Sequence, residues 1–161
     1  MKLKVTHILA VIVITSVCSS LLISQDFMYW EDDFESITIP NITTRDAEEE
    51  GEGEATLFTS GDVEISADNT ATAQLSLGIA ILRTEYKLKF DGDGTTKTGG
   101  PQVNFTDYDT FLSTPASVTH VPGDDDVKVK LSVKARNYDG QLADAGTYTA
   151  TQTLTVHWVG P

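Results

Sequence analysis

The most regular pattern in the chain is residues 127–136, VKVKLSVKAR, in which apolar and polar side chains alternate without a break. Successive side chains of a β-strand point to opposite faces, so this alternation predicts a strand with one buried and one solvated face. The same period recurs in residues 61–68, 70–82 and 85–90. Turn-forming residues separate these runs, in DGDG (91–94), TGGP (98–101), PGDDD (122–126) and NYDG (137–140). Short strands divided by such turns predict an all-β sandwich.

The first 24 residues differ from the rest. Lys2 and Lys4 precede an uncharged apolar run from Ile8 to Ile23, which is the pattern of a secretory signal. The run is also about as short as a spanning helix can be, so a retained membrane anchor and a buried core helix stay open as alternatives. The single cysteine, Cys18, lies in this segment. A secreted or cell-surface domain without disulfides is therefore expected, stabilised by core packing, bound ions or neighbouring subunits.

The chain is strongly acidic, with a formal net charge of −13. Such a surface repels nucleic acid and anionic lipid, so we expect no nucleic-acid partner, and membrane contact only through residues 1–24 if they are retained. No nucleophile elbow, zinc-protease motif or phosphate-binding glycine loop is present in the sequence. The carboxylates gather in turns and acidic runs rather than in an apolar pocket, and we therefore predict that the protein is not an enzyme.

Residues 25–54 are interpreted as an N-terminal extension of a domain formed by residues 55–161. Within the extension, residues 36–44 (SITIPNITT) read as a short strand, since Ile37 and Ile39 alternate with polar residues and Ile42 extends the apolar pattern. Residues 46–54 (DAEEEGEGE) read as a flexible linker, because like charges and glycines cannot bury enough apolar surface to offset the entropy of ordering.

The last strand, residues 148–158, has a predicted inner face of Tyr148, Ala150, Gln152, Leu154, Val156 and Trp158. Gln152 is the one polar residue on that face, and if buried its amide must find backbone partners. Asp144, Gly146 and Tyr148 resemble the D-x-G-x-Y corner of immunoglobulin-like domains. That resemblance implies a hydrogen bond from the tyrosine hydroxyl back to the chain. Ala150 stands where antibody domains have a cysteine, in agreement with the absence of a disulfide.

A complete immunoglobulin-like sandwich has one more strand after this one, and here the chain ends instead. A strand-deficient sandwich exposes a groove and unpaired backbone edges that another strand must fill. Residues 36–44 are the candidate filler. This layout resembles donor-strand pilins, archaeal bundling-pilus subunits, bacterial biofilm-matrix fibre proteins and spore-coat-type secreted pilins. The resemblance implies a filament in which Ile37, Ile39 and Ile42 of one subunit enter the next, against the acceptor strand that carries Leu154, Val156 and Trp158.

Two alternatives to the filament stay open. Residues 36–44 fold back onto their own sandwich in the first, giving a closed monomer with the same hydrogen bonds. In the second, the chain is a membrane-anchored cell-surface module with an immunoglobulin-like binding or adhesion domain.

Two kinds of accessory site are also predicted. Asp91, Asp93, Asp124 and Asp126 offer hard oxygen ligands for Ca²⁺, although turn formation explains the same residues. No other cofactor is expected. Asn41 and Asn104 begin N-x-T sequons, which permit N-glycosylation in an exported chain.

Overall fold

The computed structural model describes residues 3–5 (backbone only), 26–31, 34, 36–90, 104–120, 122–123, 125–138 and 142–160. Within these ranges the chain is nearly all β-structure, as the alternating pattern predicts, with one short 3-10 helix, η1 (Ala71–Ala73). No helix in the described part is long and apolar enough to cross a bilayer. Apart from Leu3–Val5, the predicted signal or anchor segment lies outside the described residues.

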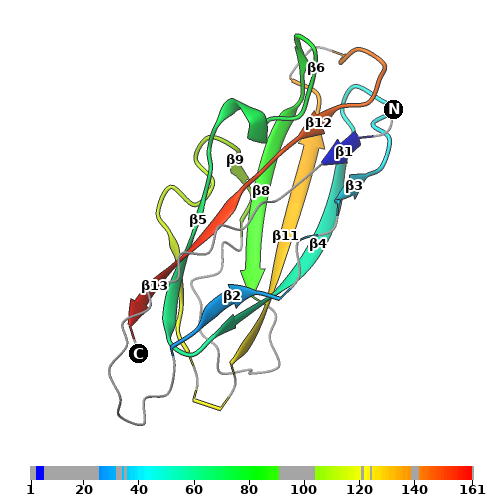
Figure 1. Cartoon of the computed structure of the whole chain (residues 1–161). Coiled ribbons are helices and arrows are strands. Elements are labelled where there is room, and N and C mark those ends of the chain that lie inside the picture. The colour runs from blue at the N-terminus through cyan, green and yellow to red at the C-terminus, as the bar shows by residue number, and fades with distance from the viewer. Residues whose placement is uncertain are drawn as a thin grey trace, which may run out of the picture.

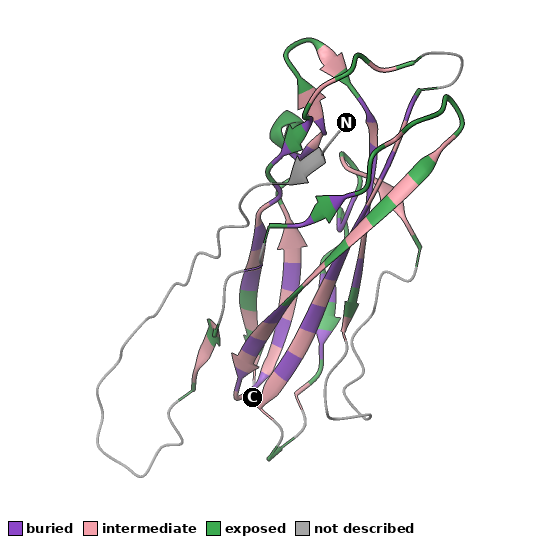
Figure 2. Cartoon of the chain, turned by 90° about the vertical axis from the view of Figure 1, so that its right-hand side faces the viewer, coloured by how far each residue is buried: buried purple, intermediate pink, exposed green. Residues whose placement is uncertain are grey.

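The largest sheet, here called the long sheet, is antiparallel and has the strand order β2-β4-β11-β8-β9. Its outer face is charged and its inner face is buried, and Figure 2 shows the alternation along the strands. The strands are β2 (Met28–Trp30), β4 (Glu48–Thr59), β11 (Asp126–Arg136), β8 (Arg83–Phe90) and β9 (Thr106–Asp107).

A second layer crosses the inner face of the long sheet (Figure 1). It contains a three-stranded sheet of order β10-β5-β13 and a five-stranded sheet of order β3-β1-β12-β6-β7. The core lies between the two layers and includes Leu57, Tyr86, Leu131 and Leu154, all fully buried. The strands are β10 (Ala116–Val118), β5 (Asp62–Ala67), β13 (Leu154–Gly160), β3 (Thr38–Ile39), β1 (Leu3–Val5), β12 (Thr149–Ala150), β6 (Ser76–Leu77) and β7 (Ala80–Ile81).

The acidic run is part of a strand, so the prediction of a flexible linker over residues 46–54 is wrong for residues 48–54. These residues form the first half of β4 and pair in register with β11, from Glu48 opposite Arg136 to Phe58 opposite Asp126. The predicted domain boundary between residues 54 and 55 therefore falls inside a continuous strand. The N-terminal extension and the sandwich share this strand and are one structural unit.

Cations on β11 are the physical reason for this strand. Four of the five glutamates of β4 project from the outer face of the long sheet, namely Glu48, Glu50, Glu52 and Glu54. There Lys130 Nζ lies 3.5 Å from Glu54 Oε2 and 3.7 Å from Glu52 Oε1. At the other end, Arg136 Nη1 lies 3.6 Å from Glu48 Oε1. Opposite charges placed directly across a strand pair stabilise a sheet, whereas the same glutamates alone repel one another. The linker prediction, made from composition alone, failed because the lysine and arginine that pair with these glutamates lie about 80 residues further along the chain.

Gly51, in the middle of the acidic run, lies on the inner face of the long sheet. Gly51 lies opposite the buried Val133, and a Cβ at Gly51 would come within 2.7 Å of both Ile37 Cγ2 and the Thr38 carbonyl oxygen. It would also lie 3.2 Å from Ile39 Cγ1. The absence of a side chain thus creates the room that β3 and its flanking residues occupy.

We predict that Gly51→Ala lowers the free energy of unfolding by about 1–3 kcal/mol, the usual cost of overpacking a core. Gly160→Ala is the matched control, because a Cβ there meets nothing within 4 Å. That control variant should differ from the wild type by less than about 0.5 kcal/mol. Urea titration followed by tryptophan fluorescence measures both. Equal midpoints for the two variants would show that residues 37–39 do not depend on the space at Gly51.

Candidate assembly site

The predicted donor segment lies against its own chain in this structure. Ile37 and Ile39 are 2% and 1% exposed, Ile42 packs at the edge of the core, and Thr38 between them faces solvent. Only Thr38–Ile39 form a strand, shorter than the predicted 36–44, because Pro40 has no N–H to continue the ladder. Within one chain this is the arrangement of the closed-monomer alternative. The name "N-terminal arm" is used below for residues 36–44.

The N-terminal arm joins β4 through a tight turn. Ala47 N–H donates to the Thr44 carbonyl at 3.3 Å, and β4 begins at the next residue, Glu48. Asn137, which is buried just after β11, donates from Nδ2 to the carbonyl oxygens of Thr44 and Arg45, at 3.0 and 3.1 Å. The turn is thus held from outside by one amide side chain. The name "hinge" is used below for this turn, residues 44–47.

Within its own chain, the N-terminal arm is not the direct neighbour of the last strand. β1 lies between them, antiparallel to β3 and parallel to β12, with Lys4 opposite both Thr38 and Thr149. Since strands in a sheet are about 4.8 Å apart, β3 and β12 are separated by a slot about one strand wide. The arm packs into the space above Gly51 on β4, and β1 occupies the slot.

The predicted acceptor strand corresponds to β12 and β13, and its inner face is as expected. Tyr148, Ala150, Gln152, Leu154 and Val156 are buried, and Trp158 packs against the core. Antiparallel β5 borders one edge of β13, and the topology places no described strand at the other edge. An edge of this length presents backbone N–H and C=O groups that another strand can pair with.

Gln152 lies in the short break between the end of β12 and the start of β13, and its side chain is fully buried. Its Nε2 donates to the carbonyl oxygens of Asp68 and Thr153, at 2.8 and 3.1 Å. The predicted backbone partners of the amide are therefore confirmed. Its Oε1 has no hydrogen-bond partner within the described residues.

The predicted tyrosine corner forms. Tyr148 Oη donates to the Asp144 carbonyl oxygen at 3.0 Å, and the Tyr148 ring is fully buried. Burial raises the pKa of the Tyr148 hydroxyl, and the negative charge of Asp144 raises it further. A Cβ at Gly146 would collide with Leu77 Cδ2, so the glycine permits the β6–β7 hairpin to pack on the corner. The corner fixes where the last strand enters the second layer.

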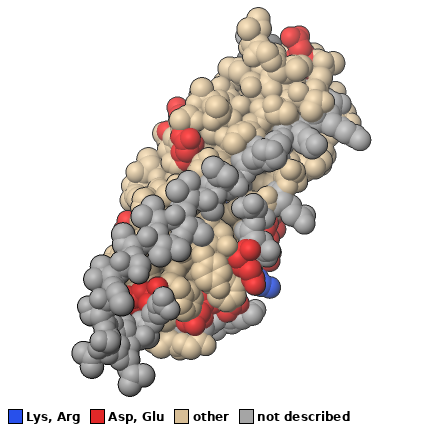
Figure 3. Space-filling view, viewed as in Figure 1, with Lys and Arg blue, Asp and Glu red and all other residues tan. Residues whose placement is uncertain are grey.

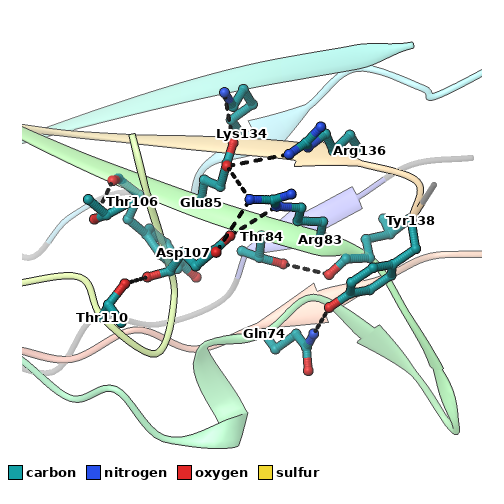
Figure 4. A network of polar contacts seen from close by, with 12 residues as sticks. Gln74, Arg83, Thr84, Glu85, Thr106, Asp107, Thr110, Lys134, Arg136 and Tyr138 are labelled. Atoms are coloured by element: carbon teal, nitrogen blue, oxygen red, sulfur yellow. Dashed lines mark hydrogen bonds and ion pairs between the residues drawn. The ribbon is translucent and has the colours of Figure 1, made fainter. Parts of the chain in front are cut away.

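The outer face of the long sheet holds a separate polar network (Figure 4). Glu85, which is 8% exposed, lies 2.7 Å from Lys134 Nζ and 3.4 Å from Arg83 Nη2, and Arg136 Nη2 is 3.8 Å away. Arg83 Nε also donates to Asp107 Oδ1 at 3.0 Å. These groups neutralise one another across β8, β9 and β11. The network therefore links β8, β9 and β11 on the outer face of the long sheet.

The accessory sites are only partly described. Asp91, Asp93 and Asp124 lie outside the described residues, and Asp126 is the first residue of β11. Among the residues that the structure covers, no three His, Cys, Asp or Glu side chains gather closely enough to hold a metal ion. Asn41 and Asn104 are both exposed, so their side chains are sterically accessible for modification.

Sequence reasoning missed two features of the site. The first is the space above Gly51 that Ile37 and Ile39 fill, and the second is the exposed apolar surface on the β6–β7 hairpin. The alternation EEEGEGE against VKVKLSVKAR was a signal for the first, because charges of opposite sign recur at the same period in both stretches. The second had a weaker signal, in that the turn LGIAI has apolar residues where a solvent-exposed turn is usually polar.

No protein-family model matches this chain, and no curated protein is similar to it.

We predict that Tyr148→Phe lowers the free energy of unfolding by about 0.5–1.5 kcal/mol at pH 7, the usual contribution of one hydrogen bond. Because the pKa of Tyr148 is raised in the folded state, wild-type stability should fall above about pH 10, where the unfolded chain loses the proton first. The variant lacks this group and should lose less stability there. Denaturant titrations between pH 7 and pH 11 measure both effects. Tyr138→Phe is the control, because it removes a hydroxyl whose hydrogen bond from Gln74 Nε2 is exposed to solvent. If Tyr148→Phe behaves like it, burial of the Tyr148 hydrogen bond adds nothing to stability.

Proposed function

We propose that the protein is a secreted structural subunit of an extracellular filament, a pilus or matrix fibre, assembled by donor-strand complementation. Its fold is proposed to be an immunoglobulin-like sandwich, supported by the two β-layers and by the Tyr148–Asp144 corner. The N-terminal arm of each copy would leave its own sandwich and occupy the same position in a neighbour. The observation that carries the proposal is the burial of Ile37 and Ile39 in a space created by a glycine in the acidic half of β4.

The energetics favour exchange between copies over permanent opening. Burial of two isoleucines contributes about 3–6 kcal/mol, so an arm without any binding position would be strongly disfavoured. A neighbouring copy offers the same contacts, and the exchange therefore costs little beyond the entropy of association. The hinge is also short of stabilising contacts, because the described hydrogen bonds of the turn are those of Ala47 and Asn137.

The open edge of β13 also supports the proposed assembly. A copy with an edge that has no described strand partner can pair with a strand from outside, and a chain of such pairings extends without closing. The acidic surface and the exposed sequon residues Asn41 and Asn104 are compatible with an exported protein. Homo-oligomerisation through strand donation is thus the proposed partnership.

One observation favours the alternative of a membrane-anchored cell-surface domain that binds or adheres. Leu3–Val5 pair with β3 and β12, and this pairing requires that the first residues remain attached. A retained N-terminus would fill the slot in the same chain and hold each copy closed at the membrane.

Mass spectrometry of the protein recovered after export distinguishes the two functions. For the filament subunit, we expect a mature N-terminus near residue 25, because removal of residues 1–24 vacates the slot between β3 and β12. An intact N-terminus beginning at residue 1 or 2 would instead support the anchored domain.

Strand donation itself is tested with a disulfide between the N-terminal arm and Gly51. The full chain carries Cys18→Ser together with Ile37→Cys and Gly51→Cys, whose side chains would meet because the Gly51 Cβ position lies 2.7 Å from Ile37 Cγ2. Donation between copies predicts a ladder of disulfide-linked multimers on non-reducing electrophoresis, which collapses to monomer on reduction.

The matched control replaces Thr38 instead of Ile37, because the Thr38 side chain faces solvent and would not meet position 51. This control should give no bridge. If Ile37→Cys/Gly51→Cys forms bridges only within single copies at every soluble concentration, the filament proposal is overturned and the closed monomer remains.

A further inference from the structure

One end of the molecule carries an open hollow of about 680 Å³, whose lining includes several exposed apolar side chains. It lies between the β6–β7 hairpin and the loop that follows β11, at the end where β6 is labelled in Figure 1. The hairpin turns through Gly78, whose φ of +62° favours glycine, and places Ile79 at its tip. The lining residues are Ile79, Ala80, Ile81, Tyr138, Leu142, Ala143 and Asp144.

The hollow collects most of the exposed apolar surface that the structure describes. Of the seven large apolar side chains that are exposed in the described part, five lie on the hairpin or the adjoining loop, and only Tyr29 and Val159 lie elsewhere. Ile79 is fully exposed and Leu142 is 62% exposed. On the face drawn in Figure 3, this end shows mainly uncharged atoms and no Lys or Arg. Several large apolar side chains exposed at one end of a molecule indicate an interaction surface.

The hinge of the N-terminal arm lies at the same end. Asn137, which binds the hinge carbonyls of Thr44 and Arg45, also accepts a hydrogen bond at Oδ1 from Ala143 N–H, at 3.0 Å. Ala143 lines the hollow. One side chain therefore connects the hinge to the wall of the hollow, and any movement of the arm takes place beside this patch.

The short connection between the arm and β4 limits where the second copy can lie. An exchanged arm ends at Thr44 in the acceptor, while its own β4 begins at Glu48 in the donor. The connection of three residues spans at most about 14 Å. The hinge ends of donor and acceptor must consequently lie next to each other, and the surfaces around the hinge come into contact.

We propose that the hollow at the β6–β7 end is the contact surface for a second copy of this chain, which covers Ile79, Ile81 and Leu142 when the arms are exchanged. The inference rests on the proposed function, since strand exchange is what brings the second copy to this end. A lipid surface is a poorer occupant, because the hollow also contains Asp144, and burying its carboxylate in hydrocarbon without a partner is costly.

The test uses the exported full chain with Cys18→Ser and the Ile37→Cys/Gly51→Cys pair, with and without Ile79→Ser/Leu142→Ser. All these measurements are made under reducing conditions first. Sedimentation velocity over a range of concentrations should show that the serine variants raise the concentration for half-assembly by at least about tenfold, as expected for two lost apolar contacts. Tyr29→Ser is the control: its side chain is 41% exposed, but it lies on β2, away from the β6–β7 end of the molecule, and it should leave assembly unchanged.

Oxidation of the same samples separates the two proposals. If Ile79→Ser/Leu142→Ser assembles like the wild type, the contact surface is overturned, whether or not the bridges form between copies. If assembly needs Ile79 and Leu142 but every bridge forms within a copy, the contact stands and strand donation fails. A wild-type chain that stays monomeric at all concentrations overturns both. Binding to phosphatidylcholine vesicles that is lost in the serine variants, without self-association, would assign the hollow to lipid and also overturn the contact.

Discussion

The pairing of β4 with β11 is the interaction on which the rest of the structure depends. It joins the acidic run to the strand with the clearest alternation in the chain, and all eleven residues of β11 take part. On the outer face it brings glutamates opposite lysines and arginine, and on the inner face it buries an unbroken apolar row from Val127 to Ala135. Exposed ion pairs contribute little individually, so the apolar row supplies most of the stability and the charges determine the register.

This pairing also decides the position of the N-terminal arm. Because Glu50 and Glu52 face outward, Gly51 between them faces inward, and the missing side chain leaves a space that Ile37 and Ile39 fill. The hinge at residues 44–47 connects the arm to β4, and Asn137 joins the hinge to Ala143 in the wall of the hollow. The arm, the hinge, Asn137 and the hollow therefore form one connected region.

Sequence patterns predicted those features that are determined by a residue and its near neighbours in the chain. The inward and outward faces of the last strand, the burial of Gln152 on backbone partners and the hydrogen bond of Tyr148 all follow from alternation and from a five-residue motif. The linker prediction failed at residues 48–54 because it considered the charges of that stretch alone. Repulsion among the glutamates disappears once Lys130 and Arg136 lie across the strand, and composition cannot reveal a partner so distant in the sequence.

By itself, the sequence determined that this chain is β-structured, which residues of most strands face the core, and that its surface is acidic, because these properties depend on the period of two and on composition. Only the tertiary structure decided which strands are neighbours. It paired the acidic run with β11, placed the arm on Gly51 rather than beside the last strand, and brought the hairpin tip at Ile79 close to the hinge. Those outcomes depend on charge, shape and space shared by segments far apart in the chain, which no local pattern encodes.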